Sequence, residues 1–220
     1  MEAASYIFLP DSCRYFFQQL YNTVDAVIVG QFAGKEALSS VGGSSSQIIN
    51  FVVGFFTGLS AGATVIISQF YGANDANKIH RALHTAYAFS IVGGIIAGII
   101  GIALTVPVMK LMNTPEELMH DSAMYVMIYF GGLVFIFVYN TGSAILRAIG
   151  DSKRPLYYLI ICCFINIVLD IVFVSVLKLG VLGVAVATFI SQLVSAVLVT
   201  RALMYHTEGK IGRASCRERV

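Results

Sequence analysis

Apolar runs about 20 residues long recur along the whole sequence, and they constrain the fold more than any other feature. A run of that length, coiled as an α-helix, crosses the hydrocarbon core of a bilayer. Of the 220 residues, 57% are hydrophobic and only 12% are charged, whereas soluble domains average roughly 25% charged residues. We therefore expect an all-α membrane protein. Nothing in this charge balance indicates a nucleic-acid partner.

Polar interruptions divide the chain into six expected transmembrane helices within one unit, residues 1–212. The helices are expected at about 10–32, 44–71, 78–112, 115–149, 156–177 and 181–205. A short polar connection is expected to begin at Gly34, and a basic turn at 150–155. Hydrophobicity stops after this unit and no seventh helix is predicted, so we expect residues 213–220 to be a non-native tail; the alternative is a genuine basic cytoplasmic tail.

Lysine and arginine positions predict the orientation of the six spans. Cytoplasmic connections carry an excess of these residues. One set of connections contains Arg14, Lys78, Arg81, Arg147, Lys153, Arg154, Arg201 and Lys210, and the other contains only Lys35, Lys110 and Lys178. Both ends of this chain are therefore expected in the cytoplasm, which places Asp25 in the outer half of the bilayer.

Two carboxylates are expected at membrane depth, Asp25 in the first helix and Asp170 in the fifth. A charge there costs roughly 2.5–3.5 kcal/mol on insertion scales, so such a residue suggests a functional site. Tyr21 precedes Asp25 by one turn and Asn166 precedes Asp170 by one turn, so each pair shares a helical face. We expect the two faces to meet and form a proton or cation site. The alternative is that the acids only hydrogen-bond to hold helices together.

The chemistry of such a pair restricts what it can bind. Two carboxylates close together in a low dielectric resist being charged at once. They must take a proton, bind a cation or pair with a base, and no Lys or Arg lies at their depth. A proton or a metal cation such as sodium remains, and the sequence does not decide between them. No cofactor and no other metal centre is expected.

Small residues in two helices suggest close packing. Gly54, Gly58 and Gly62 recur every four residues, which predicts a groove that lets another helix approach closely. The alternative is a flexible helix that lines a pathway. Cys162 and Cys163 are adjacent in an apolar run and are expected to be small core residues.

The sequence resembles the bacterial MATE (multidrug and toxic compound extrusion) transporters in four runs: QQLYNTVDAVIVGQFAGKEALSSVG, INFVVGFFTGLSAGATVIISQFYGA, LRAIGDSKRPLYY and NIVLDIVFV. The resemblance extends from about Pro10 to Tyr205. It implies the N-terminal six-helix lobe of a twelve-helix transporter in the bacterial inner membrane, with the C-terminal lobe as a missing partner. It also implies antiport, in which a drug or organic cation leaves as protons or sodium ions enter.

The resemblance further implies roles for individual residues. The aspartate of the first helix, Asp25, would be central to coupling, and the rest of its cluster would be Tyr21, Asn166, Asp170 and Thr188. Tyr125 and Asn140 are weaker matches to the same polar network. Pro10 would allow the first helix to bend when the site is protonated.

Three other functions were weighed against antiport. A flippase for lipid-linked sugars shares the architecture, but such relatives tend to place basic residues in the cavity, and this chain has none at depth. A membrane-embedded enzyme would need a nucleophile with a base, or a metal set; the two aspartates lack a protease motif, so no enzymatic activity is expected. The third is an inactive six-helix structural module.

Overall fold

A computed structural model describes Phe16, Gln19 and residues 23–73 and 76–217 of the chain. Its regular structure is helical throughout those residues, with two π-helices labelled η. The elements are η1 (Val29–Ala33), α2 (Gly34–Gly42), α3 (Ser44–Gly72), α4 (Ala76–Leu111), α5 (Glu116–Gly131), α6 (Leu133–Ala148), α7 (Lys153–Asp170), η2 (Ile171–Val176) and α8 (Gly180–Arg217). Residues 23–28 are also helical and lead into η1.

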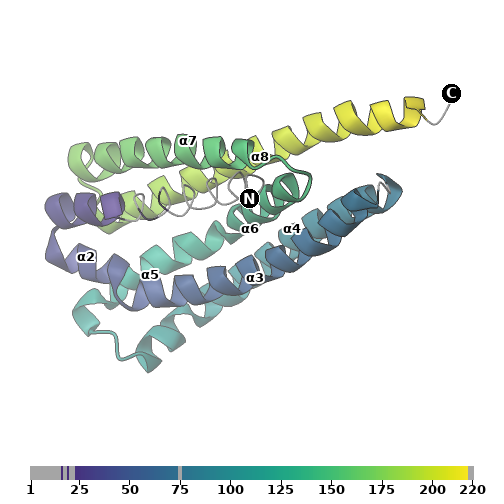
Figure 1. Cartoon of the computed structure of the whole chain (residues 1–220). Coiled ribbons are helices and arrows are strands. Elements are labelled where there is room, and N and C mark those ends of the chain that lie inside the picture. The colour runs from purple at the N-terminus through teal and green to yellow at the C-terminus, as the bar shows by residue number, and fades with distance from the viewer. Residues whose placement is uncertain (1–15, 17–18, 20–22, 74–75, 218–220) are drawn as a thin grey trace.

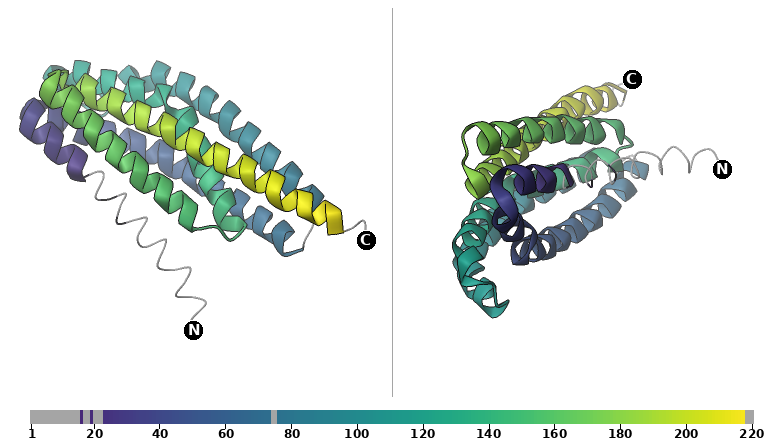
Figure 2. Two further views of the ribbon diagram at one scale, coloured as in Figure 1. Left: turned by 90° about the horizontal axis from the view of Figure 1, so that it is seen from above. Right: turned by 90° about the vertical axis from the view of Figure 1, so that its left-hand side faces the viewer.

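The long helices lie side by side as a bundle (Figure 1). Helix α8 packs against α5, α6 and α7, while α4 packs against α3, α5 and α6, so α5 and α6 join the two sides of the bundle. Two further views show the long axes running in a broadly common direction (Figure 2). This is the packing expected of helices that cross one bilayer.

Helix length and hydropathy confirm the all-α membrane class. Four stretches are long and apolar enough to cross a membrane: Ser44–Gly72, Asn77–Leu111, Lys153–Val176 and Gly180–Tyr205. The bent pair α5 and α6 would make a fifth span. About half of the first expected helix, 10–32, lies outside the described residues. Apolar side chains such as Phe51, which is 80% exposed, cover the outside of the bundle, as a lipid-facing surface requires.

The single helix expected at 115–149 is wrong, because the chain bends by 48° between α5 and α6. The break lies at Gly131 and Gly132. Glycine weakens a helix, and Gly132 also lies close to another helix: a Cβ there would lie 3.1 Å from Cδ2 of Phe189 on α8. The glycine pair thus both permits the bend and lets α8 approach it.

The connection expected to begin at Gly34 is itself helical, because the nine-residue helix α2 occupies that stretch. The chain changes direction at Gly34, whose φ of +92° favours glycine. Two other boundaries differ from the expected ones. Helix α7 begins at Lys153, inside the expected basic turn, and α8 runs on to Arg217, into the segment 213–220 that was set apart.

Asp151 explains the early start of α7. Its carboxylate accepts a hydrogen bond from the backbone N–H of Arg154 at 3.2 Å and pairs with the Nε of that guanidinium, also at 3.2 Å. A carboxylate bound to a first-turn N–H stabilises the start of a helix. The basic turn is therefore short and capped by its own acid.

The glycines of α3 have no packing partner among the described residues of this chain. A Cβ built on Gly54, Gly58 or Gly62 would meet no atom within 4 Å. Close packing occurs instead on α4, where a Cβ on Gly94 would lie 2.7 Å from Cα of Val134 and one on Gly98 would lie 2.8 Å from the carbonyl oxygen of Phe130. The helix that needs its glycines for close approach is therefore α4, against the α5–α6 bend.

This difference gives a direct test. Gly94→Ala is expected to destabilise the fold, because its methyl group would collide with backbone and overpacking of this kind costs about 1–3 kcal/mol. Gly58→Ala is the matched control and is expected to be neutral or stabilising by up to ~1 kcal/mol, since alanine favours the helix. Thermal unfolding of both variants in detergent measures the difference. Equal midpoints would contradict the packing assigned to α4.

Candidate functional site

The structure joins the two membrane-depth acids through one amide. Asn166 and Asp170 lie one turn apart on α7, and both are fully buried. With its amide nitrogen turned toward the acids, Asn166 donates to Oδ2 of Asp170 at 3.1 Å and to Oδ1 of Asp25 at 2.8 Å. The two carboxyl groups also lie close enough to interact electrostatically. The helical faces that carry Asp25 and Asp170 therefore meet.

The apolar core brings these elements together. Val24, Ile28 and Val29, which flank Asp25, belong to the same packed cluster as Ile167 of α7 and Val184 of α8. In addition, η1 contacts both η2 and α8, and α7 packs along α8. The polar groups thus sit among apolar side chains contributed by the expected first, fifth and sixth helices.

Both acid-bearing helices change to π geometry just beyond the acid. The π-helix η2 begins at the residue after Asp170, and η1 begins one turn after Asp25. The two π-helices contact each other. Single π turns are rare in helices and frequently occur at functional sites. Periodicity in the sequence gives no signal for them.

Tyr125 lies near the acid cluster, and Thr188 lies on α8, which packs against the elements that carry the acids. Thr188 is buried on α8, one turn after Val184 of the shared core. Tyr125 is buried on α5, close enough to both carboxyl groups to interact with them electrostatically. The polar network that the resemblance implied for these two residues stays a prediction.

The other predicted residues are not joined to this cluster by the structure. Tyr21 and Pro10 lie outside the described residues. Asn140 is half-buried on α6, beyond the bend. Within the described part of the chain, no hydrogen bond links Asn140 to either acid.

One residue near the acids was assigned only a packing role from the sequence. Cys163 is buried on α7 and lies close enough to Asp25 to interact with it electrostatically. It precedes Asn166 by three residues, so the two share a face of the helix. That spacing could have placed Cys163 beside the acids.

The atoms of this cluster that could bind a ligand are mainly oxygens. Among the described residues, Oδ1 of Asp170 and Oγ1 of Thr188 are buried and have no hydrogen-bond partner. Buried oxygens normally have partners, so such atoms require an explanation. Carboxylate, amide and hydroxyl oxygens are suitable ligands for a proton or a hard cation. No Lys or Arg occurs in residues 15–34, 155–177 or 179–200 to neutralise the acids instead.

Comparisons with known proteins agree with this architecture. The probable multidrug resistance proteins YoeA and YpnP of Bacillus subtilis (strain 168) are 33% and 32% identical to the chain, each over 80% of it and 39% of the relative. A crystal structure of MATE in the straight conformation superposes with a TM-score of 0.83 at 26% identity, over 90% of this chain and 44% of that one. The chain thus spans about two fifths of the length of the curated relatives it matches.

A match to a family model assigns the chain to a protein family. The MatE model matches residues 10–172, which include Asp25, Asn166 and Asp170. The match covers most of the chain and agrees with the helical bundle, its apolar surface and the similar solved structures. The chain belongs to the MATE family of multidrug efflux transporters.

Proposed function

We propose that this chain forms the ion-coupling lobe of a cation-driven exporter, in which a proton or a sodium ion exchanges for a drug or an organic cation. The observation that carries the proposal is the buried amide of Asn166 bound to both Asp25 and Asp170. This arrangement holds two carboxyl groups together where their charge must be compensated. The site residues are Asp25, Asn166 and Asp170, with Thr188 and Tyr125 around them.

Electrostatics favours exchange of a cation at this site. Two adjacent carboxylates cannot both be ionised at low cost in an apolar interior. One of the two carboxyl groups is therefore expected to hold a proton when no other cation is bound. Sodium could replace that proton, since the unpartnered oxygens of Asp170 and Thr188 add ligands of the right kind. An ion that binds or leaves here changes the charge of the core by one unit.

The relatives support export of small molecules. YoeA and YpnP are described as probable multidrug resistance proteins. The excess of Lys and Arg on one set of connections supports a bacterial inner-membrane location with both ends of this chain in the cytoplasm. The absence of basic residues at the depth of the acids favours cationic substrates over the phosphate-linked sugars of a flippase.

Cation binding to the purified chain tests the proposal directly. If sodium is the coupling ion, NaCl is expected to raise the unfolding midpoint relative to choline chloride at equal ionic strength. A sodium concentration of 100 times the dissociation constant would add about 2.7 kcal/mol to the free energy of unfolding. If the proton is the coupling ion, sodium is expected to have no effect, and infrared spectra should show a protonated carboxyl group.

Two variants separate coupling from packing. Asp170→Asn is expected to remove the sodium response or the protonated-carboxyl band, because it removes one of the two acids. Glu117→Gln, an exposed acid at the start of α5, is expected to keep either signal. Persistence of the signal in Asp170→Asn, or absence of any signal in the unsubstituted chain, would favour the view that the acids only hold helices together.

A further inference from the structure

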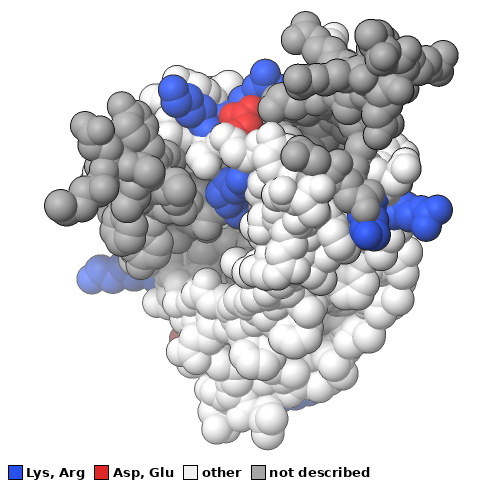
Figure 3. Space-filling model, turned by 45° about the vertical axis from the view of Figure 1, so that its right-hand side comes forward, with Lys and Arg blue, Asp and Glu red and all other residues white. Residues whose placement is uncertain are grey.

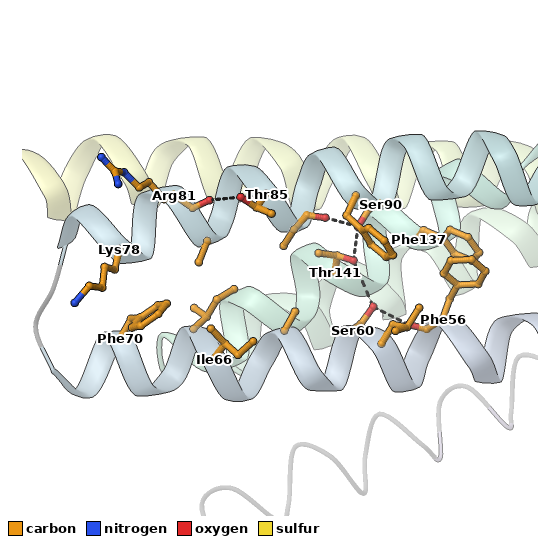
Figure 4. A pocket seen from close by; sticks show the side chains of 16 residues that line it. Phe56, Ser60, Ile66, Phe70, Lys78, Arg81, Thr85, Ser90, Phe137 and Thr141 are labelled. Atoms are coloured by element: carbon orange, nitrogen blue, oxygen red, sulfur yellow. Dashed lines mark hydrogen bonds between the residues drawn. The ribbon is translucent and has the colours of Figure 1, made fainter.

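A second cavity, separate from the acid cluster, lies between α3, α4 and α6. Its volume is about 540 Å³. Figure 4 shows its walls as two helices with side chains from each pointing into the space between them. Aliphatic and aromatic groups form most of the lining, among them Ile66 and Phe70 of α3 and Phe89 of α4. We call this cavity the α3–α4 groove.

The inner end of the α3–α4 groove is closed by a hydroxyl cluster. Ser90 donates to Thr141 at 2.6 Å, and the hydroxyls of Ser60 and Thr141 lie 3.4 Å apart. The hydroxyls of Ser60 and Ser90 also lie within hydrogen-bond distance of carbonyl oxygens of their own helices, as alternative acceptors for their single protons. The three hydroxyl groups have hydrogen-bond partners within the protein, so a bound ligand does not have to supply any. An apolar chain would lose few hydrogen bonds by entering.

The outer end of the groove is cationic. Lys78 and Arg81, on the first turns of α4, line it at the boundary of the span Asn77–Leu111. Lys78 Nζ also lies 6.0 Å from the ring centroid of Phe70. Among the residues that the structure describes, no Asp or Glu lines the cavity. Basic side chains gather toward one end of the face in Figure 3, while most of the remaining surface there is uncharged.

We propose that the α3–α4 groove binds an anionic phospholipid, with its phosphate at Lys78 and Arg81 and one acyl chain along the apolar walls. At ~1.5 Å per residue, the interval from Arg81 to Ser90 is about 14 Å along α4, which matches a linear apolar group better than a compact solute. The N-terminal end of α4 adds a favourable field for an anion. Two positive charges at the opening disfavour a cationic drug, so we do not assign this groove to the exported cation.

Native mass spectrometry of the 220-residue chain in detergent tests the proposal. Phosphatidylglycerol is expected to bind more tightly than phosphatidylcholine with identical acyl chains. The double variant Lys78→Gln/Arg81→Gln should weaken phosphatidylglycerol binding on the order of tenfold, as two basic groups near an anionic headgroup imply. The control Lys153→Gln/Arg201→Gln removes the same charge from exposed positions outside the groove and should leave binding unchanged.

A second variant tests the acyl-chain part while keeping both charges. Ala63→Phe places a ring inside the groove and is expected to displace the lipid without altering the headgroup site. Equal binding of the two lipids, unchanged binding in Ala63→Phe, or equal losses in both double variants would overturn the proposal. Displacement of the lipid by inorganic phosphate alone would reassign the site to free anions. A dimer abolished by Ala63→Phe but unaffected by lipid would reassign the groove to a second copy of the chain.

Discussion

Asp25→Asn is expected to abolish drug export by a full-length transporter that carries this sequence as its N-terminal lobe. The amide keeps the size of the carboxyl group but holds no ionisable proton and brings no negative charge to a cation. Ion exchange at the acid cluster would then stop. The new asparagine can still hydrogen-bond to Asn166 and Asp170, but its own charge cannot change. The measurement is ethidium efflux from bacteria that produce residues 1–212 joined to the C-terminal half of YoeA.

Controls make this result specific to the membrane-depth acid. The unsubstituted chimera must export ethidium, and Glu117→Gln should export at the same rate, since its side chain is exposed at the start of α5. Protein levels of all three are compared by immunoblot. Efflux by Asp25→Asn at the rate of the unsubstituted chimera would exclude a coupling role for Asp25.

The 220-residue chain expressed by itself is expected to insert into the membrane but to give no drug resistance. Alternating access requires one repeat to move against another around a site between them, and this chain aligns with only about two fifths of its relatives. The open face at Gly54, Gly58 and Gly62 would then contact lipid or a second copy. We therefore expect self-association or degradation, with cation binding at Asp25 retained.

An efflux-deficient bacterium provides the measurement. Cells that produce the chain are compared with cells that produce a full-length relative, at matched protein levels and over a series of drug concentrations. Resistance conferred by the chain, and lost on Asp25→Asn, would show that two copies can rebuild a transporter. That outcome would refute the requirement for a second, different lobe.

Much of the architecture could be predicted because its signals are local. Apolar runs of bilayer length define the spans at α3, α4 and α8, and the i,i+4 spacing of Asn166 and Asp170 places both on one face of α7. The cost of an isolated acid in a membrane then makes Asp25 a reasonable partner. Which atoms meet is a matter of tertiary packing, so the bridging geometry of Asn166 came only from the structure.

The differences at the α3 glycines, at the α5–α6 bend and at α2 have a common physical cause. Glycine patterns report where a helix can be approached closely and say nothing about whether a neighbour is there. Gly54, Gly58 and Gly62 have the regular spacing but face open space, whereas Gly94 meets the backbone of Val134. The bend at Gly132 and the short helix α2 likewise depend on contacts distant in sequence.

The adjacent π-helices have a consequence for how the acids can move. A π turn closes its hydrogen bond one residue later than an α turn, so the side chains that follow it are turned by about 100° from the α-helical register. Because η1 and η2 touch each other next to Asp25 and Asp170, a change between π and α geometry in either element would turn one acid-bearing helix relative to the other. If ion exchange requires Asp25 or Asp170 to reorient, we therefore expect the backbone to change at these two π-helices.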